Sequence, residues 1–377
     1  MSAYFSSYED LAVHRIMLSD TERNAFYEAA LQRAVAACKA RGKAPVVLDV
    51  GAGTGLLSFL ALEAGAAKVI AVEPSEIARS LEAAVAAAAV GDRLTVVHDT
   101  IENAIIAGTI TPSCVDILVS EWMGFHLVHE GMLASVFAAR VALKDDGFMI
   151  PEAAELAAQP VSCPDLWNRH VGFWHQESIH SLPLAPFRDA AIAQALAKPL
   201  IEALPGDAVV GGRAVIASLD LTSATEEDLV RLEATLPLPL APGDPTVHAI
   251  ALSFTVSFQS IVLDTRPSDK PTHWKQSILL LPSPLSIISP DNDSVILTDI
   301  SLVQLPAADE GGVEAGRGYQ ISLEYRPAYA DEVTGMLAGC SCGRADKEEG
   351  DEGDVNMDGE KAAACAQCMI LDILRAQ

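Results

Sequence analysis

Residues 46–55 read VVLDVGAGTG, an apolar run that leads directly into Gly51, Gly53 and Gly55. A short apolar run bounded by glycine is typical of a buried strand. Glycine lets the backbone approach a ligand closely, and a helix N-terminus favours an anionic group. The stretch therefore predicts a buried strand, a ligand-binding turn and a helix in that order.

The same alternation continues along the chain. Strand patterns recur at KVIAVEPS, LTVVHD and VDILVSEW, with helical patterns between them and a last helix through Leu143. This predicts an α/β fold, with a doubly wound, Rossmann-like parallel sheet over residues 44–150. Helical spacing covers residues 7–43, with Gly42 as a stop, so we expect helices in an N-terminal segment, 1–43.

Beyond Pro151 the pattern changes to short alternating runs such as HAIALSFTVSF, QSILLL and YQISLEY. This predicts an antiparallel sheet or β-barrel over residues 151–338. Within that region a helix-like stretch, AAIAQALAKPLIEAL, ends at Leu204. Residues 339–377 contain the acid-rich DKEEGDEGDVNMDGEK, which we expect to be a flexible insert, followed by a short C-terminal helix.

Composition limits the partners of the protein. The chain has 377 residues, enough for two ordinary domains, and a formal net charge of −26. Such a charge disfavours direct nucleic-acid binding and suits Arg- or Lys-rich protein segments, although it also keeps a protein soluble. We expect neither a signal peptide nor a membrane span. The seven scattered cysteines fit the reducing cytoplasm or nucleus.

The glycine turn and the second strand indicate a nucleoside cofactor. Glu73 ends the second strand, where its carboxylate can accept both hydroxyls of a ribose, and Asp49 precedes the turn. The spacing is G-x-G-x-G and lacks the G-x-G-x-x-G pattern of dinucleotide folds. S-adenosylmethionine therefore fits better than NAD. The alternative is that these glycines only allow tight packing.

Three motifs then resemble the protein arginine methyltransferases. SEWMGFHLVHEGML, residues 120–133, resembles the double-glutamate loop of that family. PTHWKQ, residues 271–276, resembles its Thr-His-Trp loop, and YFSSYEDLAVHRIMLSDTER resembles its N-terminal helix. The likeness covers roughly residues 4–330. It implies a class I S-adenosylmethionine-dependent methyltransferase domain followed by a β-barrel, whose helical arm, here 164–204, makes a homodimer.

The resemblance implies a cofactor site for S-adenosylmethionine, which becomes S-adenosylhomocysteine, and it implies no metal. Arg23 would meet the methionine carboxylate, and Glu102 would accept from the adenine amino group. The cofactor-binding positions are Phe5, His14, Arg23, Asp49, Gly51, Gly53, Glu73, Ile101 and Glu102.

The resemblance also assigns the chemistry. Glu121 and Glu130 would grip an arginine guanidinium, whose planar fork of donors matches carboxylates. Asp20 and His273 would pair and remove the proton, although water could also take it. The positions that would shape the substrate pocket are Tyr4, Tyr8, Met17, Met132 and Trp274.

The expected reaction is methylation of arginine in proteins, giving monomethyl and asymmetric dimethyl products, as in type I and especially type-6-like members. Glycine–arginine-rich segments, histone tails and RNA-binding proteins are the substrates the family implies. Two alternatives remain: a catalytically silent partner of a related methyltransferase, and a nicotinamide-dependent oxidoreductase.

Several positions depart from the family pattern. Phe125 stands where Tyr is commoner, Gly131 replaces a Ser or Asn, and His126 and His129 are unusual in the loop. The tail adds a C-x-C and a C-x-x-C pair, which we expect to stay reduced rather than to bind zinc. The residues of these pairs are Cys340, Cys342, Cys365 and Cys368.

Overall fold

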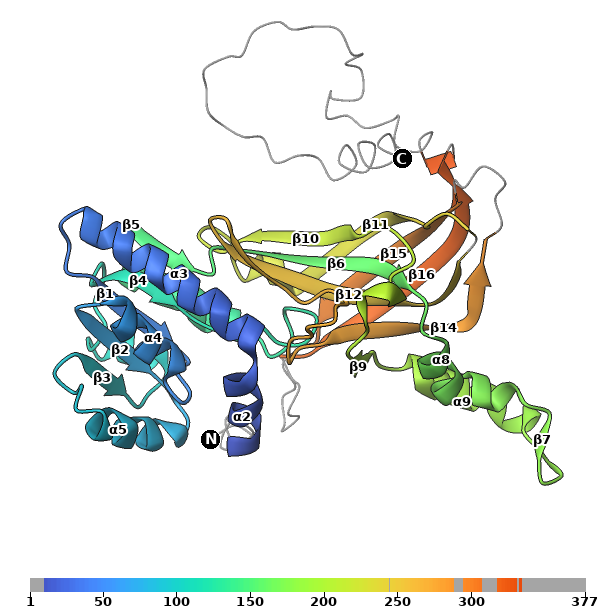
Figure 1. Cartoon of the computed structure of the whole chain (residues 1–377), viewed down its shortest axis with the longest axis horizontal. Coiled ribbons are helices and arrows are strands. Elements are labelled where there is room, and N and C mark those ends of the chain that lie inside the picture. The colour runs from blue at the N-terminus through green and yellow to red at the C-terminus, as the bar shows by residue number, and fades with distance from the viewer. Residues whose placement is uncertain (1–9, 244, 288–293, 307–316, 331, 334–377) are drawn as a thin grey trace, which may run out of the picture.

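The computed structural model describes residues 10–243, 245–287, 294–306, 317–330 and 332–333. Two units follow one another along the chain, a parallel sheet with helices and an antiparallel β-structure from which a helical arm projects (Figure 1). Tyr4, Phe5, Tyr8 and the four tail cysteines lie outside the described residues.

The N-terminal unit is a five-stranded parallel sheet in the order β3-β2-β1-β4-β5. Its central strands are apolar along most of their length because both faces are covered; every residue of β4 is buried. The strand order reverses beside β1, the position where such sheets bind ligands. The strands are β1 (Val46–Val50), β2 (Lys68–Val72), β3 (Leu94–Val97), β4 (Val115–Val119) and β5 (Leu143–Ile150). The helices are α2 (Leu11–Ser19), α3 (Thr21–Ala40), α4 (Leu56–Ala64), α5 (Ile77–Ala87), α6 (Ile101–Ile106) and α7 (Leu133–Ala139).

The described part of the N-terminal segment forms two helices, α2 and α3, and the run of helical spacing does not mark the break between them. The break falls at Asp20, whose backbone is extended and whose side chain accepts a hydrogen bond from the N–H of Arg23 at 3.0 Å. Asp20 is thus the N-cap of α3, the position that aspartate prefers. The break directs α2 across the end of the sheet (Figure 1). The predicted helix through Leu143 is also shorter, since α7 ends at Ala139 and β5 begins at Leu143.

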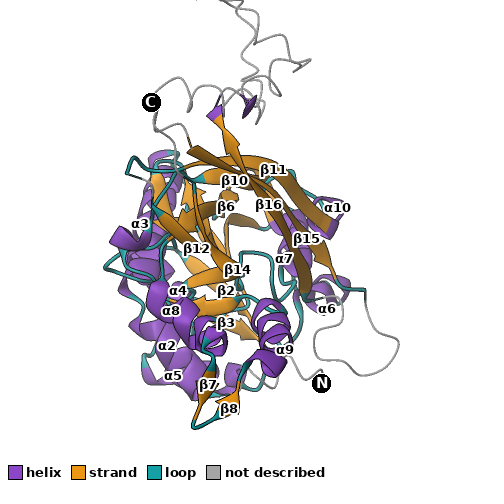
Figure 2. Cartoon of the chain, turned by 90° about the vertical axis from the view of Figure 1, so that its right-hand side faces the viewer, coloured by secondary structure: helices purple, strands orange, loops and turns teal. Residues whose placement is uncertain are grey.

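The C-terminal unit is antiparallel throughout, and Figure 2 shows its strands curving around a shared interior. One sheet has the order β10-β6-β12-β14-β9, with β13 paired to β12, and the other has the order β11-β15-β16. Its strands are β6 (Ala153–Val161), β9 (Leu200–Glu202), β10 (Ala214–Asp220), β11 (Arg231–Pro239), β12 (Thr246–Phe258), β13 (Ile261–Asp264), β14 (Gln276–Ser286), β15 (Ser294–Gln304) and β16 (Tyr319–Tyr329), with helix α10 (Glu227–Val230) before β11.

The arm leaves the barrel after β6 and returns through β9. It contains α8 (Pro164–His170), the short strands β7 (Ser178–Ile179) and β8 (Leu182–Pro183), and α9 (Ala185–Leu196). The predicted helix to Leu204 is wrong in its second half, because the chain ends α9 before Pro199 and pairs Leu200–Glu202 with β14. A proline disfavours helical conformation in the residue before it.

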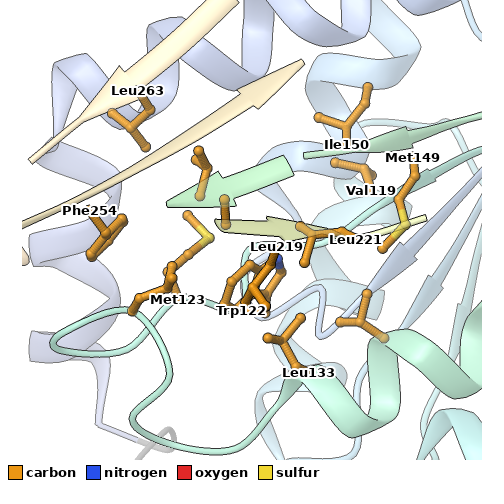
Figure 3. Packing of buried hydrophobic residues seen from close by; sticks show 14 of the residues in the cluster. Val119, Trp122, Met123, Leu133, Met149, Ile150, Leu219, Leu221, Phe254 and Leu263 are labelled. Atoms are coloured by element: carbon orange, nitrogen blue, oxygen red, sulfur yellow. The ribbon is translucent and has the colours of Figure 1, made fainter. Parts of the chain in front are cut away.

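One core joins the two units. Figure 3 shows Trp122 and Met123, from the loop after β4, packed among Leu219 of β10 and Phe254 of β12. The indole N–H of Trp274 fixes this loop by donating to the Met123 carbonyl at 2.6 Å. The double-glutamate segment is therefore anchored in the junction between sheet and barrel.

Within the described residues no helix is long and apolar enough to cross a membrane.

Candidate functional site

The glycine turn after β1 opens a cavity of about 600 Å³ at the carboxyl edge of the sheet. Gly51, Gly53 and Gly55 have φ values of 73°, 54° and 85°, the left-handed region that suits glycine. A Cβ atom on Gly51 would collide with the Met132 side chain, and one on Gly53 would lie 3.3 Å from His14. Glycine here leaves room for a ligand against the backbone.

Most of the predicted site residues lie around this one cavity, although they come from α2, α3, the sheet and the barrel. Asp20 does not line the cavity but contacts the lining residue His273, and Asp49 is the sequence neighbour of the lining residue Val50. The predicted residues that line it are His14, Met17, Arg23, Gly51, Gly53, Glu73, Ile101, Glu102, Glu121, Glu130, Met132, His273 and Trp274.

Glu73 is held in place at the end of β2. One carboxylate oxygen accepts the Gly53 N–H at 2.8 Å, and the other accepts the N–H and hydroxyl of Ser75 at 2.8 and 2.5 Å. Each carboxylate oxygen has about two acceptor positions, so the carboxylate can still accept a hydroxyl group from a ligand. This suits recognition of a ribose.

The other side of the cavity carries Glu102, one oxygen of which accepts a hydrogen bond from Ser135 at 2.6 Å. Ile101 lines the cavity beside it. A carboxylate acceptor beside an apolar wall suits an adenine ring with its amino group. Ser135 was not predicted, because a serine inside a helical pattern carries no signal of its own.

Asp49 is fully buried beneath the turn. Burial raises its pKa to about 7, against the opposing hydrogen bond from Ser58 at 2.7 Å, and Glu73 raises it further. Its other oxygen is buried with no hydrogen-bond partner among the described residues. A buried carboxyl group with a free acceptor favours a positively charged or donor-bearing ligand group nearby.

Arg23 pairs with Glu121. Its Nε and Nη2 lie 3.2 and 2.9 Å from one oxygen of Glu121, and both side chains are over nine-tenths buried. Burial lowers the pKa of Arg23, but Glu121, Tyr27 and Asp20 together outweigh burial and raise the pKa. Glu121 is thus the carboxylate that Arg23 contacts in this structure. The guanidinium offers more N–H groups than these bonds use, so its expected contact with the cofactor carboxylate stays a prediction.

Asp20 and His273 are brought together across 253 positions of the sequence. One Asp20 oxygen lies 2.8 Å from His273 Nδ1 and accepts the His273 N–H at 2.8 Å. Burial would raise the pKa of Asp20, but the hydrogen bonds that it accepts, above all that of His273, outweigh burial and lower the pKa. A neutral His273 that donates from Nδ1 has Nε2 as its acceptor. Trp274 packs against this ring, with ring centroids 3.9 Å apart.

Glu130 has an unpredicted partner, Arg317, from the segment before β16. The Glu130 N–H donates to the Arg317 carbonyl at 2.8 Å, and Arg317 Nη1 donates to the Glu130 carbonyl at 3.0 Å. Arg317 also lines the cavity. An isolated arginine between two glycines gave no sign of this role in the sequence.

The unusual loop residues take different positions. Phe125 lines the cavity and is 37% exposed, so it contributes an apolar edge without a hydroxyl. His126 is buried against Ser277 at 3.3 Å, and burial together with His129 lowers its pKa to about 3. His126 is therefore neutral near pH 7 and serves packing.

Metal ligation has no support in the part of the chain that the structure describes, where no group of three or more His, Cys, Asp or Glu residues could hold an ion. The cysteines considered for zinc lie outside that part.

Comparisons with known proteins give the family. Residues 152–326 match the model for the arginine methyltransferase oligomerization subdomain. The chain is 33% identical over 305 residues to protein arginine N-methyltransferase 6 of Xenopus laevis, covering 79% of this chain and 86% of that protein. The chain belongs to the protein arginine methyltransferase family.

Further relatives agree. The probable protein arginine N-methyltransferase 6 of Arabidopsis thaliana is 28% identical, over 86% of this chain and 79% of that protein. The Trypanosoma brucei PRMT1 enzyme-prozyme heterotetrameric complex with AdoHcy matches with a TM-score of 0.71 and 29% identity, over 86% of this chain and 96% of that one. A PRMT6 structure with SAH matches with a TM-score of 0.65 and 30% identity, covering 84% of this chain and all of that one. These matches confirm the predicted family and fold class.

Replacing Glu73 tests the cofactor site. Glu73→Gln should weaken S-adenosylmethionine binding about tenfold, because a charged acceptor for the ribose is lost. Isothermal titration calorimetry measures the change, and the exposed Glu63→Gln on α4 is the control. Equal affinities for the wild type and Glu73→Gln would remove Glu73 from the site.

Asp49 makes stability depend on pH. Its folded-state pKa of about 7 lies above the ordinary value of 3.8, so the folded state binds an extra proton between these values. Wild-type stability therefore falls relative to Asp49→Asn as pH rises from about 4 to about 8, by a few kcal/mol at most since one pKa unit is about 1.4 kcal/mol. Denaturant titrations of the apoprotein at the two pH values measure this, with the exposed Asp92→Asn as control. A difference that does not change with pH would show that the pKa of Asp49 is not raised.

Proposed function

We propose that this protein transfers methyl groups from S-adenosylmethionine to the guanidino nitrogens of arginine residues in proteins. One observation carries the proposal: Glu121 and Glu130 line the same cavity as the glycine turn and Glu73. The relatives named above are arginine methyltransferases, and two of the solved neighbours are complexes with AdoHcy or SAH, the product form of this cofactor.

The two glutamates orient the substrate. A guanidinium is planar and permanently charged, and carboxylates bind its N–H groups in fixed geometry. Two carboxylates in one cavity hold it from two sides and direct one terminal nitrogen toward the turn. S-adenosylmethionine, which the glycine turn and Glu73 would hold, would supply an electrophilic methyl group on its sulfonium when bound. Most of the catalysis is orientation, which is worth several kcal/mol in well-placed reactants.

The proton that the product nitrogen loses needs an acceptor. His273, held by Asp20 through Nδ1, lines the cavity with Nε2 as its second ring nitrogen and is our first candidate; water is the second. Since Asp20 also caps α3, the pair fixes the N-terminal helices to the barrel at the point where the proton leaves.

We further propose type I specificity, with asymmetric dimethylarginine as the final product. Met17 from α2 and Met132 from the start of α7 both line the cavity. Their side chains restrict where a methylated nitrogen can lie, which favours a second methyl on the same nitrogen.

A homodimer through the arm is a further part of the proposal. The matched family model carries the name of an oligomerization subdomain, and a solved neighbour is a heterotetramer. The arm also presents apolar side chains to solvent, as an interface requires. These are Phe173, Leu182, Phe187 and Leu196.

The proposed substrates are arginine-rich segments, such as histone tails or RNA-binding proteins, which the net charge of −26 suits. We propose a cytoplasmic or nuclear location, because the cysteines of the described residues, Cys38, Cys114 and Cys163, are free thiols.

A silent partner subunit is the second candidate, since one solved neighbour pairs an enzyme with a prozyme. The presence of both glutamates in the cavity favours an active enzyme.

Replacing Glu121 tests the function. The wild type should convert a glycine–arginine-rich peptide to monomethyl and asymmetric dimethyl products. Glu121→Gln should lower turnover about 100-fold or more, because one of the two carboxylates that bind the substrate guanidinium loses its charge. Mass spectrometry of fragment ions identifies the products, and thermal melting checks folding. Exposed Glu22→Gln, near the start of α3, is the control.

Symmetric product would retain the enzyme and overturn the type I proposal. The wild type is assayed alone and in a mixture with a related methyltransferase. If it binds S-adenosylmethionine but adds no peptide methylation in either assay, the proposal that it is an enzyme is refuted. Activity that appears only in the mixture with the related methyltransferase would support the role of a silent partner subunit.

A further inference from the structure

The loop between Glu121 and Glu130 has a backbone shape that its own residues disfavour. His126, Leu127 and Glu130 are not glycines but have φ values of 42°, 71° and 88°. Such conformations are uncommon outside glycine and persist where surrounding contacts hold them. Gly131 follows with a φ of 64°. The contacts that hold the loop therefore decide where the Glu130 carboxylate points.

Among the described residues, three from the C-terminal unit hold the loop at different places. Trp274 donates to the Met123 carbonyl, and Ser277 contacts His126. Arg317 exchanges two hydrogen bonds with the backbone of Glu130 itself, at 2.8 and 3.0 Å. Both backbone polar groups of the strained residue are thus bound by one arginine.

Charge adds to this geometry. Glu121 and Glu130 line one cavity, and like charges that share a cavity repel. Arg23 neutralises Glu121 from the α3 side, with 2.9 Å between Nη2 and the carboxylate. Arg317 places its guanidinium 3.0 Å from the backbone carbonyl of Glu130, from the barrel side, and lines the same cavity. Each glutamate therefore has an arginine of the chain beside it, from a different unit.

We propose that Arg317 is the positioning residue for Glu130. It fixes the strained Glu130 backbone from the barrel and so determines the position of the Glu130 carboxylate, the second of the two that would bind the substrate guanidinium. This inference rests on the proposed function. It makes the barrel part of the catalytic geometry, since Arg317 lies just before β16. Arg317 itself acts through Glu130 and needs no contact with the substrate.

The test is a double-mutant cycle with Arg317→Met and Glu130→Gln. Binding of a glycine–arginine-rich peptide to the S-adenosylhomocysteine-loaded protein is measured by calorimetry, with turnover as a second readout. We expect Arg317→Met to weaken peptide binding and lower kcat at least about tenfold, while the affinity for S-adenosylmethionine changes less than about threefold. In the Glu130→Gln background, the same change should weaken peptide binding less than about threefold. Non-additivity of this kind identifies residues that act together.

Two further variants complete the design. Arg317→Lys keeps the charge and a donor, so it should bind peptide with intermediate affinity, and it replaces Arg317→Met if that variant does not fold. Arg140→Met is the matched control, because Arg140 also reaches from the sheet unit to barrel carbonyls, those of Leu221 and Ala224, at 3.3 and 2.6 Å. Arg140 is not among the residues that line the cavity, so this control should leave peptide binding unchanged within about threefold.

Equal effects of Arg317→Met in the wild-type and the Glu130→Gln backgrounds would overturn the proposal, and so would unchanged binding and kcat. A wild type that neither binds nor methylates the peptide would instead refute the function on which the proposal rests.

Discussion

The attraction between carboxylates and arginine is the interaction on which this structure depends. Glu121 already satisfies part of its charge with Arg23, in a pair that is over nine-tenths buried. Breaking such a buried pair leaves an uncompensated charge, which costs several kcal/mol. The same chemistry that would bind a substrate guanidinium therefore also holds the cavity together.

Three parts of the chain meet at this one cavity. The first helices supply Arg23 and Asp20, the sheet supplies the glycine turn and both glutamates, and the barrel supplies His273 and Arg317. None of the three parts contains a complete site. Asp20 shows the coupling most clearly, because a single carboxylate begins α3 and binds a histidine on the barrel. Rigid contact between the units is thus a condition for the geometry of the site.

The sequence predicted the elements that repeat a simple pattern. Strands β1, β2 and β4 are largely apolar runs, since both faces of a parallel sheet are covered, and the glycine turn directly follows β1. The pairing of Asp20 with His273 came from the family resemblance. Helical spacing did not mark the break at Asp20, because it continues on both sides; the structure shows that Asp20 is the N-cap of α3 and also binds His273.

The contacts that the sequence did not predict join single polar residues that are far apart along the chain. Ser135 and Arg317 reach their glutamates across the fold, with no local pattern to mark them. The second half of the predicted arm helix pairs with β14 instead, because tertiary pairing and Pro199 outweigh its helical composition. Long-range contacts of single polar residues are thus the part of the site that periodicity does not encode.

The most direct measurement is a crystal structure of the protein with S-adenosylhomocysteine and an arginine-containing peptide. The account predicts the peptide guanidinium between Glu121 and Glu130, with nitrogen–oxygen distances of about 2.7–2.9 Å to both carboxylates. It also predicts one terminal nitrogen facing the cofactor sulfur. A guanidinium bound elsewhere, or held by only one of the two glutamates, would contradict the account.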